Sequence, residues 1–428
     1  ATYPSLYSAP TLSLAPYQML NAMISRCMQS VILRPCSAVT LRRFHAGVND
    51  TLSDPDLIPL QKMVSKSVQR RSLGLLGLPN VGKSTTYNAL TGTLAARMAD
   101  FPFCTIDPQV GRVSPPDAIL KDLSTLFPSA NVIPLQFDIV DIAGLVEGAS
   151  MGAGMGNAFL SHVRSCTGLC HCLKGYNADA TGSRPFEELL RDMHVIEDEL
   201  ILADLSTVEK VLNKPKQDKQ TITLLQRVQT KLEERHNLRQ MLVNREEARI
   251  LQSLQLLSAK PMLLCVNHGS YELHNQEACQ QMRDWAQKDG RILLEIQARN
   301  MSDMLAFEGA DKEEFAEMIN FSMDDEIRFW NAFDQAIRTV LDISSFYTAG
   351  ETEIRTWPIN TGAYAAEAAG VIHTDMQKGF IAAEVVDVHE FIERKGSWAS
   401  CRRDGQVRVE GRTYPMKATD LVLFRFNV

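Results

Sequence analysis

The chain has 428 residues, of which 45% are hydrophobic and 22% charged, and its formal net charge is −7. This composition is typical of a globular protein long enough for two or three domains, and it argues against disorder. The negative net charge argues against a protein whose whole surface coats nucleic acid, although it is compatible with a local basic patch. No apolar run approaches the length of a membrane-spanning helix. Nine cysteines, an odd number scattered along the chain, indicate reduced thiols in a reducing compartment rather than a disulfide framework.

The first 49 residues contain no Asp and no Glu, whereas four arginines lie among many Ser and apolar residues. A stretch at 28–44 interleaves apolar residues with arginines, which is compatible with an amphipathic helix and is typical of an organelle transit peptide. A cytosolic tail is the alternative. Acidic residues return at Asp50, so we expect residues 1–66 to be a targeting extension and the folded protein to start near Ser67.

A phosphate-binding motif follows. Residues 77–85 have the sequence G-L-P-N-V-G-K-S-T, a complete G-x-x-x-x-G-K-[ST] loop between a strand-length apolar run at 72–76 and a helical run at 86–91. The two glycines of the motif allow backbone amides to turn toward a polyphosphate. Lys83 would supply a compact charge for the terminal phosphates, and the Ser84 hydroxyl is suited to Mg²⁺. The flanking strand and helix disfavour a chance match.

Two further segments stand at the distances expected of the loops that respond to nucleotide in switch-type NTPases. A turn-rich stretch at 100–108 contains Thr105, the candidate to contact Mg²⁺ and the γ-phosphate. An apolar strand at 135–140 then leads into Asp141-Ile-Ala-Gly144, a D-x-x-G motif. Asp141 would hold Mg²⁺ through water and the Gly144 amide would sense the γ-phosphate, so loss of that phosphate would release both loops.

The next residue is Leu145, where many GTPases carry a glutamine that orients the attacking water. Leucine forms no side-chain hydrogen bond, so we expect slow intrinsic turnover in which a partner, a cation or a backbone group positions the water. The glycine-rich segment 147–157 predicts a mobile second switch that leads into a helix at 158–164. Three cysteines and a histidine within 166–172 have the residue types of a metal site, but residues 167–173 have the pattern of a buried strand, which we favour.

These motifs, with Phe101-Pro-Phe-Cys-Thr-Ile-Asp-Pro108, Gly156-Asn-Ala-Phe-Leu-Ser161 and Gly370-Val-Ile-His-Thr-Asp375, resemble the YchF or Obg-like ATPase family over about residues 70–428. The resemblance implies a translation-factor-related P-loop NTPase that prefers ATP and has a hydrophobic residue at the position of Leu145. Together with the N-terminal extension, it implies a ribosomal subunit or an assembly intermediate as partner, in the mitochondrion or alternatively the cytoplasm. We expect no membrane association, and a homo-oligomer is a further candidate. Asn80 matches a loop asparagine that helps to bind K⁺ in related GTPases, the alternative being an ordinary loop residue.

Base recognition is where the chain departs from this family. A carboxylate accepts well from the two N–H donors on the pairing edge of guanine, and the family usually has N-x-x-E after the strand predicted at 261–266. Here Asn267-His-Gly-Ser270 follows, with Ser270 in place of the glutamate and Glu272 two residues late. We therefore expect poor selectivity for guanine and favour ATP, although binding with little selectivity is also allowed. Asn267 can still bond a purine edge, and Ala298, after a strand at 292–296, resembles the last base-contacting loop.

The remaining segments predict two further parts. Residues 186–258 are charged, helix-prone and nearly free of glycine, with a partial apolar stripe that includes Leu225, Val228, Leu232 and Leu242. We interpret this segment as an antiparallel helical hairpin inserted into the nucleotide domain. From residue 343 onward, short strands with turn glycines and a crossing helix near 388–393 resemble a TGS domain.

In this last part, residues 361–364 stand where the TGS family commonly has a lysine-bearing turn. His373 and Asp375 lack an accompanying nucleophile, so a turn-stabilising role is favoured over catalysis. Arg394, Lys395, Arg402 and Arg403 are candidates to meet phosphate, with ordinary surface as the alternative.

The sequence thus predicts an α/β protein with a P-loop nucleotide-binding domain at 67–185 and 259–341, a helical hairpin at 186–258 and a β-grasp (TGS) domain at 342–428. The expected activity is slow Mg²⁺-dependent hydrolysis, with ATP preferred over GTP and K⁺ as a further candidate cofactor. An inactive nucleotide-binding structural factor and an ordinary GTPase are the alternatives. Candidate catalytic residues are Lys83, Thr105 and Gly144, and candidate metal ligands are Ser84, Thr105 and Asp141. Candidate nucleotide-binding residues are Asn80, Val81, Gly82, Lys83, Ser84, Thr85, Asn267, His268 and Ala298.

Overall fold

The computed structural model describes residues 57–65, 71–92, 109–142, 154–176, 184–215, 218–268 and 276–427. All described elements belong to the unit that spans Asp50–Val428. The extension predicted at the N-terminus therefore lies almost wholly outside the described residues. Among the helices that are described, none has both the length and the apolar character needed to cross a bilayer.

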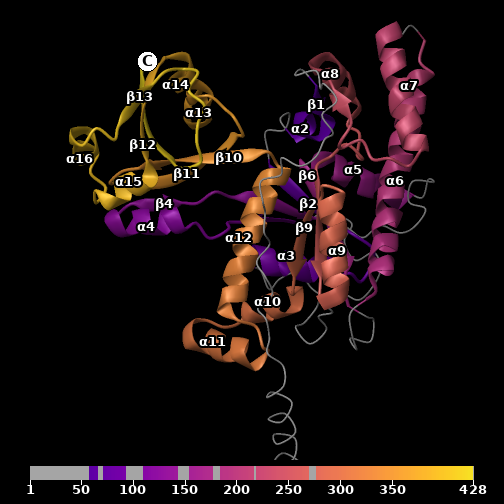
Figure 1. Cartoon of the computed structure of the whole chain (residues 1–428), viewed down its shortest axis with the longest axis horizontal. Helices are drawn as coiled ribbons and strands as arrows, with labels where there is room; N and C mark the ends of the chain where they lie inside the picture. The colour runs from indigo at the N-terminus through magenta and orange to yellow at the C-terminus, as the bar shows by residue number, and fades with distance from the viewer. Residues whose placement is uncertain are drawn as a thin grey trace, which may run out of the picture. The chain divides into compact units, whose positions relative to one another are not determined.

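The nucleotide domain contains a six-stranded sheet in the order β3-β5-β2-β6-β8-β9. All neighbouring strands are parallel except β3, which runs antiparallel to β5 at one edge. The central strands are almost continuously apolar because helices cover both of their faces (Figure 1). The strands are β2 (Ser72–Leu76), β3 (Gln109–Val113), β5 (Phe137–Asp141), β6 (Gly168–Lys174), β8 (Met262–Asn267) and β9 (Ile292–Ile296).

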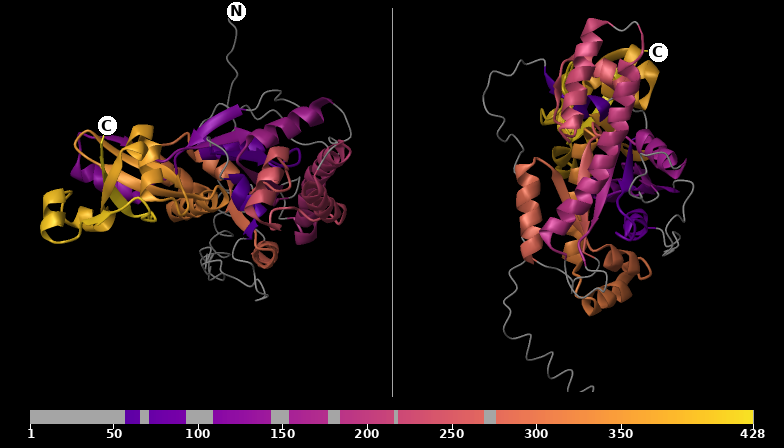
Figure 2. Two further views of the ribbon diagram at one scale, coloured as in Figure 1. Left: turned by 90° about the horizontal axis from the view of Figure 1, so that it is seen from above. Right: turned by 90° about the vertical axis from the view of Figure 1, so that its right-hand side faces the viewer.

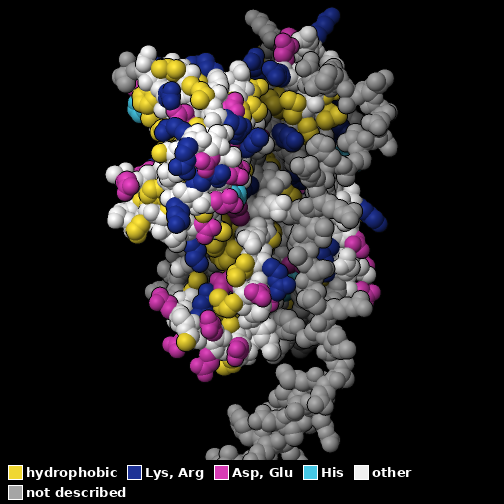
Figure 3. All heavy atoms as spheres, turned by 60° about the vertical axis from the view of Figure 1, so that its left-hand side comes forward, with side chains coloured by type: hydrophobic (Ala, Val, Ile, Leu, Met, Phe, Trp, Pro, Cys, Tyr) yellow, Lys and Arg dark blue, Asp and Glu magenta, His cyan; other side chains and the backbone are white. Residues whose placement is uncertain are grey.

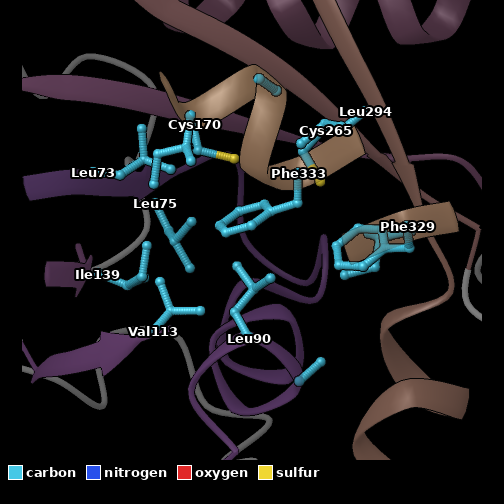
Figure 4. Close-up of a cluster of buried hydrophobic side chains, with 14 of the residues drawn as sticks. Leu73, Leu75, Leu90, Val113, Ile139, Cys170, Cys265, Leu294, Phe329 and Phe333 are labelled. Carbon is cyan, nitrogen blue, oxygen red and sulfur yellow. The ribbon is translucent and has the colours of Figure 1, made fainter. Parts of the chain in front are cut away.

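Alternation along each strand divides the apolar side chains between two cores. Leu73 and Leu75 of β2 pack in a cluster with helices α3 (Lys83–Thr91), α10 (Ala298–Met304) and α12 (Met323–Val340). Figure 4 shows Phe333 reaching from α12 toward Leu75 and Leu90 in this cluster. The other face packs against α5 (Gly154–Ser165), α6 (Phe186–Leu212) and α9 (Gln276–Lys288), while α11 (Gly309–Met318) precedes α12.

The predicted buried strand at 167–173 is confirmed as β6, and the alternation of its side chains explains why its thiols form no metal site. Cys170 and Cys172 lie in the cluster beneath α12, whereas Cys166 packs in the cluster on the opposite face. His171, between Cys170 and Cys172, also points to the opposite face from them and is fully buried. Among the described residues, the one group of His, Cys, Asp or Glu with metal-ligand geometry lies elsewhere.

The segment inserted between β6 and β8 contains the predicted pair of helices, α6 and α7 (Lys219–Glu233), and further elements that the sequence did not predict. These are β7 (Leu242–Val243) and α8 (Arg245–Leu254). Two elements from before the P-loop, β1 (Ile58–Pro59) and α2 (Leu60–Ser65), pack against this segment. β1 pairs with β7, and Leu60 is fully buried in the core of the insertion. The folded chain therefore begins before the start predicted near Ser67, because residues 58–65 complete the core of the insertion, whose other members lie at 201–259.

The apolar stripe predicted on the insertion is partly wrong. Leu225, Val228 and Leu232 are buried on one face of α7, as helical spacing requires. Leu242, in contrast, belongs to strand β7 and is 43% exposed. The side chain of the neighbouring Val243 is the one that turns into the core.

The C-terminal part is a sheet in the order β13-β12-β14-β10-β11-β4. β14 lies parallel to β10, and β10 and β11 form an antiparallel hairpin, which is the β-grasp arrangement predicted. Between the hairpin and β12 the chain forms helix α13 (Ala365–Ile372), which packs on the sheet and was missed in the sequence; the predicted helix at 388–393 is present as α15. The other elements are β10 (Ile343–Ala349), β11 (Glu353–Asn360), α14 (Thr374–Lys378), β12 (Phe380–Asp387), α16 (Trp398–Arg403), β13 (Arg408–Glu410) and β14 (Asp420–Phe426).

His373 has the predicted turn-stabilising role, since its Nδ1 accepts from the backbone N–H of Asp375 at 3.2 Å at the start of α14. The edge strand β4 (Asn131–Ile133), in contrast, was not expected in this sheet. It pairs in parallel with β11, and α4 (Ala118–Leu126) packs Leu120 and Leu123 against the same sheet (Figures 1 and 2). A segment between β3 and β5 of the nucleotide domain thus completes the C-terminal sheet.

Candidate nucleotide-binding site

The P-loop has the backbone conformation that its sequence predicts. Asn80 and Gly82 adopt φ angles of 59° and 88°, in the left-handed region that asparagine and glycine enter most readily. A Cβ added to Gly77 would lie 2.5 Å from the carbonyl oxygen of Cys172, so the loop packs directly on the end of β6. Helix α3 starts at Lys83, and Gly82 has no side chain with which to cap its first amides. These amides form the positive end of a helix, which suits a phosphate.

Lys83 is held inside this loop. Its Nζ donates to the carbonyl oxygens of Gly77 and Leu78, each at 3.1 Å, and the residue is 9% exposed. Burial lowers the pKa of Lys83 from its usual value, and the nearby Cys172 and Asp141 oppose that shift. The loop carbonyls therefore direct the ammonium group toward the space that the loop encloses, as contact with a terminal phosphate requires.

Two oxygen-bearing side chains meet beside the start of α3. The Ser84 hydroxyl donates to Oδ2 of Asp141, the last residue of β5, at 3.1 Å. Burial raises the pKa of Asp141 to about 6, while Lys83 and the bond from Ser84 act in the opposite direction. A hydroxyl and a carboxylate at this distance fit Mg²⁺, which takes few protein oxygens and completes its shell with water and phosphate.

Asn267, at the end of β8, joins two loops. Its Nδ2 donates to the carbonyl oxygen of Val81 at 3.1 Å, and its Oδ1 accepts from the backbone N–H of Ala298 at 3.3 Å. Asn267 is 2% exposed and Ala298 is fully buried. The predicted base-contacting residues and the P-loop are therefore parts of one hydrogen-bonded unit.

His268 is directed differently from the other candidate residues. Its ring is 2% exposed, and Nε2 lies 3.3 Å from Glu295 Oε1 on β9. The backbone N–H of His268 donates to the carbonyl oxygen of Ile296 at 2.9 Å. The imidazole thus lies among residues of β9 and α9.

The comparisons with known proteins agree with this geometry. A family model described as a 50S ribosome-binding GTPase matches residues 72–268, and the model of the YchF GTPase C-terminal domain, described as a protein of unknown function, matches residues 343–427. The ribosome-binding ATPase YchF of Bacillus subtilis (strain 168) is 35% identical over 370 residues, covering 83% of this chain and 99% of its own length. The chain belongs to the YchF/Obg-like ATPase family.

Further members of the YchF/Obg-like family match over the same extent. Obg-like ATPase 1 of Caenorhabditis elegans is 36% identical, with 83% of this chain and 92% of that protein covered. The structure of the Schizosaccharomyces pombe YchF GTPase superposes with a TM-score of 0.67 at 28% identity, covering 83% of this chain and 98% of that one. The predicted family, its α/β fold and its P-loop NTPase domain are thereby confirmed.

Several residues that the sequence singled out in this YchF/Obg-like chain lie outside the described residues. They include the switch residues Thr105, Gly144 and Leu145, and Ser270 with Glu272 of the base-recognition loop. Their roles stay predictions. Of the loop residues that are described, Val81 is buried, Thr85 is half-buried and Asn80 is exposed.

Tyr176 is a neighbour of the site that the sequence did not reveal. A Cβ added to Gly82 would lie 3.8 Å from its hydroxyl oxygen, and Lys174 Nζ lies 5.0 Å from the centre of its ring. Tyr176 lies two residues after the last residue of β6, and parallel α/β sheets bind ligands at the carboxyl ends of their strands. The position of Tyr176 just beyond a strand end was therefore the sequence signal that could have identified it as a neighbour of the site.

Proposed function

We propose that the chain is a slow, Mg²⁺-dependent ATPase whose nucleotide state controls its engagement of a ribosomal particle. The observation that carries the proposal is the contact of Ser84 with Asp141 at 3.1 Å, beside a helix start and a buried Lys83. Ser84 and Asp141 supply a cation site, the helix start supplies backbone N–H donors, and Lys83 supplies a positive charge, all beside the P-loop. Phosphoryl transfer depends mainly on such positioning and charge stabilisation.

In this proposal each group has a separate task. The amides at the start of α3 and the Lys83 ammonium bind the β- and γ-phosphates, and Ser84 and Asp141 hold Mg²⁺, which neutralises charge on the phosphate oxygens. Leu145 offers no hydrogen bond to the attacking water, so turnover is slow until another group positions that water. The preference for ATP rests on Ser270, which places no carboxylate where guanine would need one.

The test is hydrolysis by the purified full chain with Lys83→Ala and, as a matched control, Lys288→Ala. Lys288 is an exposed lysine in the last turn of α9. We expect the first variant to lose at least 100-fold in ATP turnover and the control to keep wild-type turnover. Equal turnover in Lys83→Ala would reject the assignment, and GTP displacing labelled ATP better than ATP itself would reject the base preference.

The proposed partner rests on the relatives, which are named ribosome-binding ATPases, and on the surface of the C-terminal part. Figure 3 shows Lys and Arg side chains interspersed with acidic ones on one face of the molecule. Arg403 is 75% exposed although it pairs with Asp404, whereas Arg394 is bonded to Glu390 and Asp404. Because acidic neighbours partly neutralise these arginines, the surface suits contact with a few phosphate groups rather than with an extended RNA backbone.

Two measurements test the partner and its location. We expect the chain to cosediment with ribosomal particles from mitochondria, and the cosedimenting fraction to change between ATP and ADP. A tagged full-length chain should be found in mitochondria. A tagged chain found wholly in the cytosol would reject the mitochondrial location while leaving the ATPase proposal intact.

A further inference from the structure

Three side chains that offer nitrogen, sulfur and oxygen as metal ligands converge near the carboxyl ends of β8 and β9. They are His268 after β8, Cys279 on α9 and Glu295 on β9, and their ligand atoms all lie within 4.8 Å of one another. His268 Nε2 lies 3.3 Å from Glu295 Oε1 and 3.8 Å from Cys279 Sγ. His268 and Cys279 are 2% and 4% exposed.

These separations are close to those of a metal centre. With Zn–N and Zn–O bonds of about 2.0–2.1 Å and Zn–S bonds of about 2.3 Å, ligand atoms at the corners of a tetrahedron lie about 3.3–3.6 Å apart. The imidazole–carboxylate distance falls in that range, and the imidazole–thiol distance exceeds it by a few tenths of an ångström. Because Cys279 Sγ also lies 3.9 Å from Nδ1, it is nearly equidistant from the two ring nitrogens, and binding would require the Cys279 side chain to move toward the Nε2 edge of the ring.

The surroundings orient the two ligands of the sheet. Arg283 on α9 donates to Glu295 Oε2 at 2.5 Å, which leaves Oε1 facing the imidazole. A Cβ added to Gly175 would lie 3.0 Å from His268 Nδ1, so the absence of a side chain at Gly175 makes room for the ring in this orientation. Groups that orient ligands in this way are a regular part of metal sites and strengthen the binding.

We propose that His268, Cys279 and Glu295 form a binding site for a transition-metal dication of the Zn²⁺ class. A thiolate, an imidazole and a carboxylate together favour Zn²⁺ over Mg²⁺ or Ca²⁺, which take oxygen ligands. On binding, the Cys279 thiol proton passes to solvent and the sulfur–metal bond forms, so that a thiolate and a carboxylate face the dication while Arg283 stays paired with Glu295. Three protein ligands leave a fourth position for water or another ligand.

The site would act on the nucleotide pocket through its position. His268 adjoins Asn267, whose side chain bonds to both the P-loop and the N–H of Ala298. A metal that joins the end of β8 to α9 and β9 would hold this strand end in place. The inference goes beyond the proposed ATPase and does not depend on it.

Cobalt titration of the full-length chain tests the proposal, because thiolate-bound Co²⁺ has a charge-transfer band in the near ultraviolet and tetrahedral Co²⁺ absorbs visible light. The chain is first dialysed against a chelator and kept free of nucleotide and Mg²⁺. We expect one equivalent of Co²⁺ to produce both bands, and one equivalent of Zn²⁺ to remove them. No band in the wild-type chain overturns the proposal, whatever its ATPase activity.

Variants locate the metal. Cys279→Ser should lose the charge-transfer band, whereas Cys401→Ser, at a fully buried cysteine of the C-terminal part, should keep it. Glu295→Gln should keep the thiolate band but need at least tenfold more Co²⁺, which supplies an independent test if the Cys279 variant does not fold. A band that persists unchanged in Cys279→Ser or in Glu295→Gln places the metal elsewhere and overturns the assignment.

Discussion

The side-chain amide of Asn267 donates to the backbone carbonyl of Val81 at 3.1 Å, so that the end of β8 holds the P-loop from the side of the base-recognition loop. The oxygen of the same amide accepts from the N–H of Ala298. Both bonds are buried, and a buried hydrogen bond left without its partner is costly. The sequence suggested a purine contact for Asn267, and the structure adds a scaffolding role.

Replacing Asn267 by alanine should weaken nucleotide binding. The two lost bonds help to hold the P-loop in its binding conformation and contribute about 1–2 kcal/mol. Their loss should raise the dissociation constant for nucleotide about tenfold. Titration with a fluorescent ATP analogue measures it. Asn300→Ala is the matched control, since Asn300 is also buried in α10 but bonds to Gln297. An unchanged affinity in Asn267→Ala, or an equal loss in the control, would contradict the scaffolding role.

Gly82→Ala should abolish nucleotide binding. The added Cβ would lie 2.3 Å from Asn267 Nδ2, and the φ angle of 88° is itself unfavourable for alanine. Gly362→Ala separates the two effects, because Gly362 has a φ of 76° with no atom within 4 Å of an added Cβ. We expect that control to lose about 1 kcal/mol of stability from backbone strain and no nucleotide affinity. Calorimetric titration with ATP and thermal unfolding distinguish the outcomes.

Asp117 should stabilise the junction between the α4–β4 segment and the C-terminal sheet. Its carboxylate caps α4 through the N–H of Leu120, and it also accepts from the Tyr347 hydroxyl at 3.1 Å and from Thr356 Oγ1 at 3.2 Å. We expect Asp117→Ala to lower the free energy of unfolding by about 3 kcal/mol, the sum of a lost cap and two lost, partly buried bonds.

Asp218→Ala provides the control for Asp117, because Asp218 caps α7 at an exposed position, where its carboxylate accepts from the N–H and the hydroxyl of Thr221 in the same helix. It should destabilise the protein less than Asp117→Ala. A double-mutant cycle between Asp117→Ala and Tyr347→Phe should give a coupling energy of about 1 kcal/mol in urea unfolding. Additive effects of the two substitutions would show that the bond from Tyr347 contributes nothing to this stabilisation.

Asp204 on α6 should make stability depend on pH. Its buried carboxylate accepts from the N–H of Leu257 at 2.8 Å and from the hydroxyl of Ser258 at 2.6 Å. Burial raises its pKa from 3.8 to about 6, while the bonds from Ser258 and Leu257 and the charge of Arg164 oppose the shift. Lys260, whose own pKa burial lowers to about 8, and the buried Arg239 are further charged groups that interact with it.

Because this pKa is higher in the folded state, the folded protein binds more protons between pH 4 and 6, and Asp204 then contributes less stability as pH rises. The full change is about 3 kcal/mol. We expect Asp204→Asn to remove that part of the slope in urea unfolding measured from pH 4 to 7. Asp198→Asn, at a partly exposed carboxylate of the same helix that pairs with Arg235, is the matched control for replacing an aspartate by asparagine. The same slope in Asp204→Asn and wild type would contradict the assignment.

The sequence by itself determined the elements whose signals are local. The glycines, the lysine and the serine of the P-loop have fixed spacing because one short loop must surround a phosphate, and the strand at 72–76 was predicted with its observed limits. The strand predicted at 292–296 before Ala298 is present with those limits, and Asp141 was placed at a strand end by its motif. The order of these motifs was enough to identify the family.

Tertiary structure alone decided which distant segments share a core. β4 joins the C-terminal sheet and Leu60 the core of the insertion, although each lies far from its partners in sequence. The cluster of His268, Cys279 and Glu295 has no recognisable spacing, since its members come from a strand end, a helix and a neighbouring strand. Hydrophobic burial is non-directional, and pairing along a sheet edge depends on which edge is free, so neither leaves a local pattern that a sequence can display.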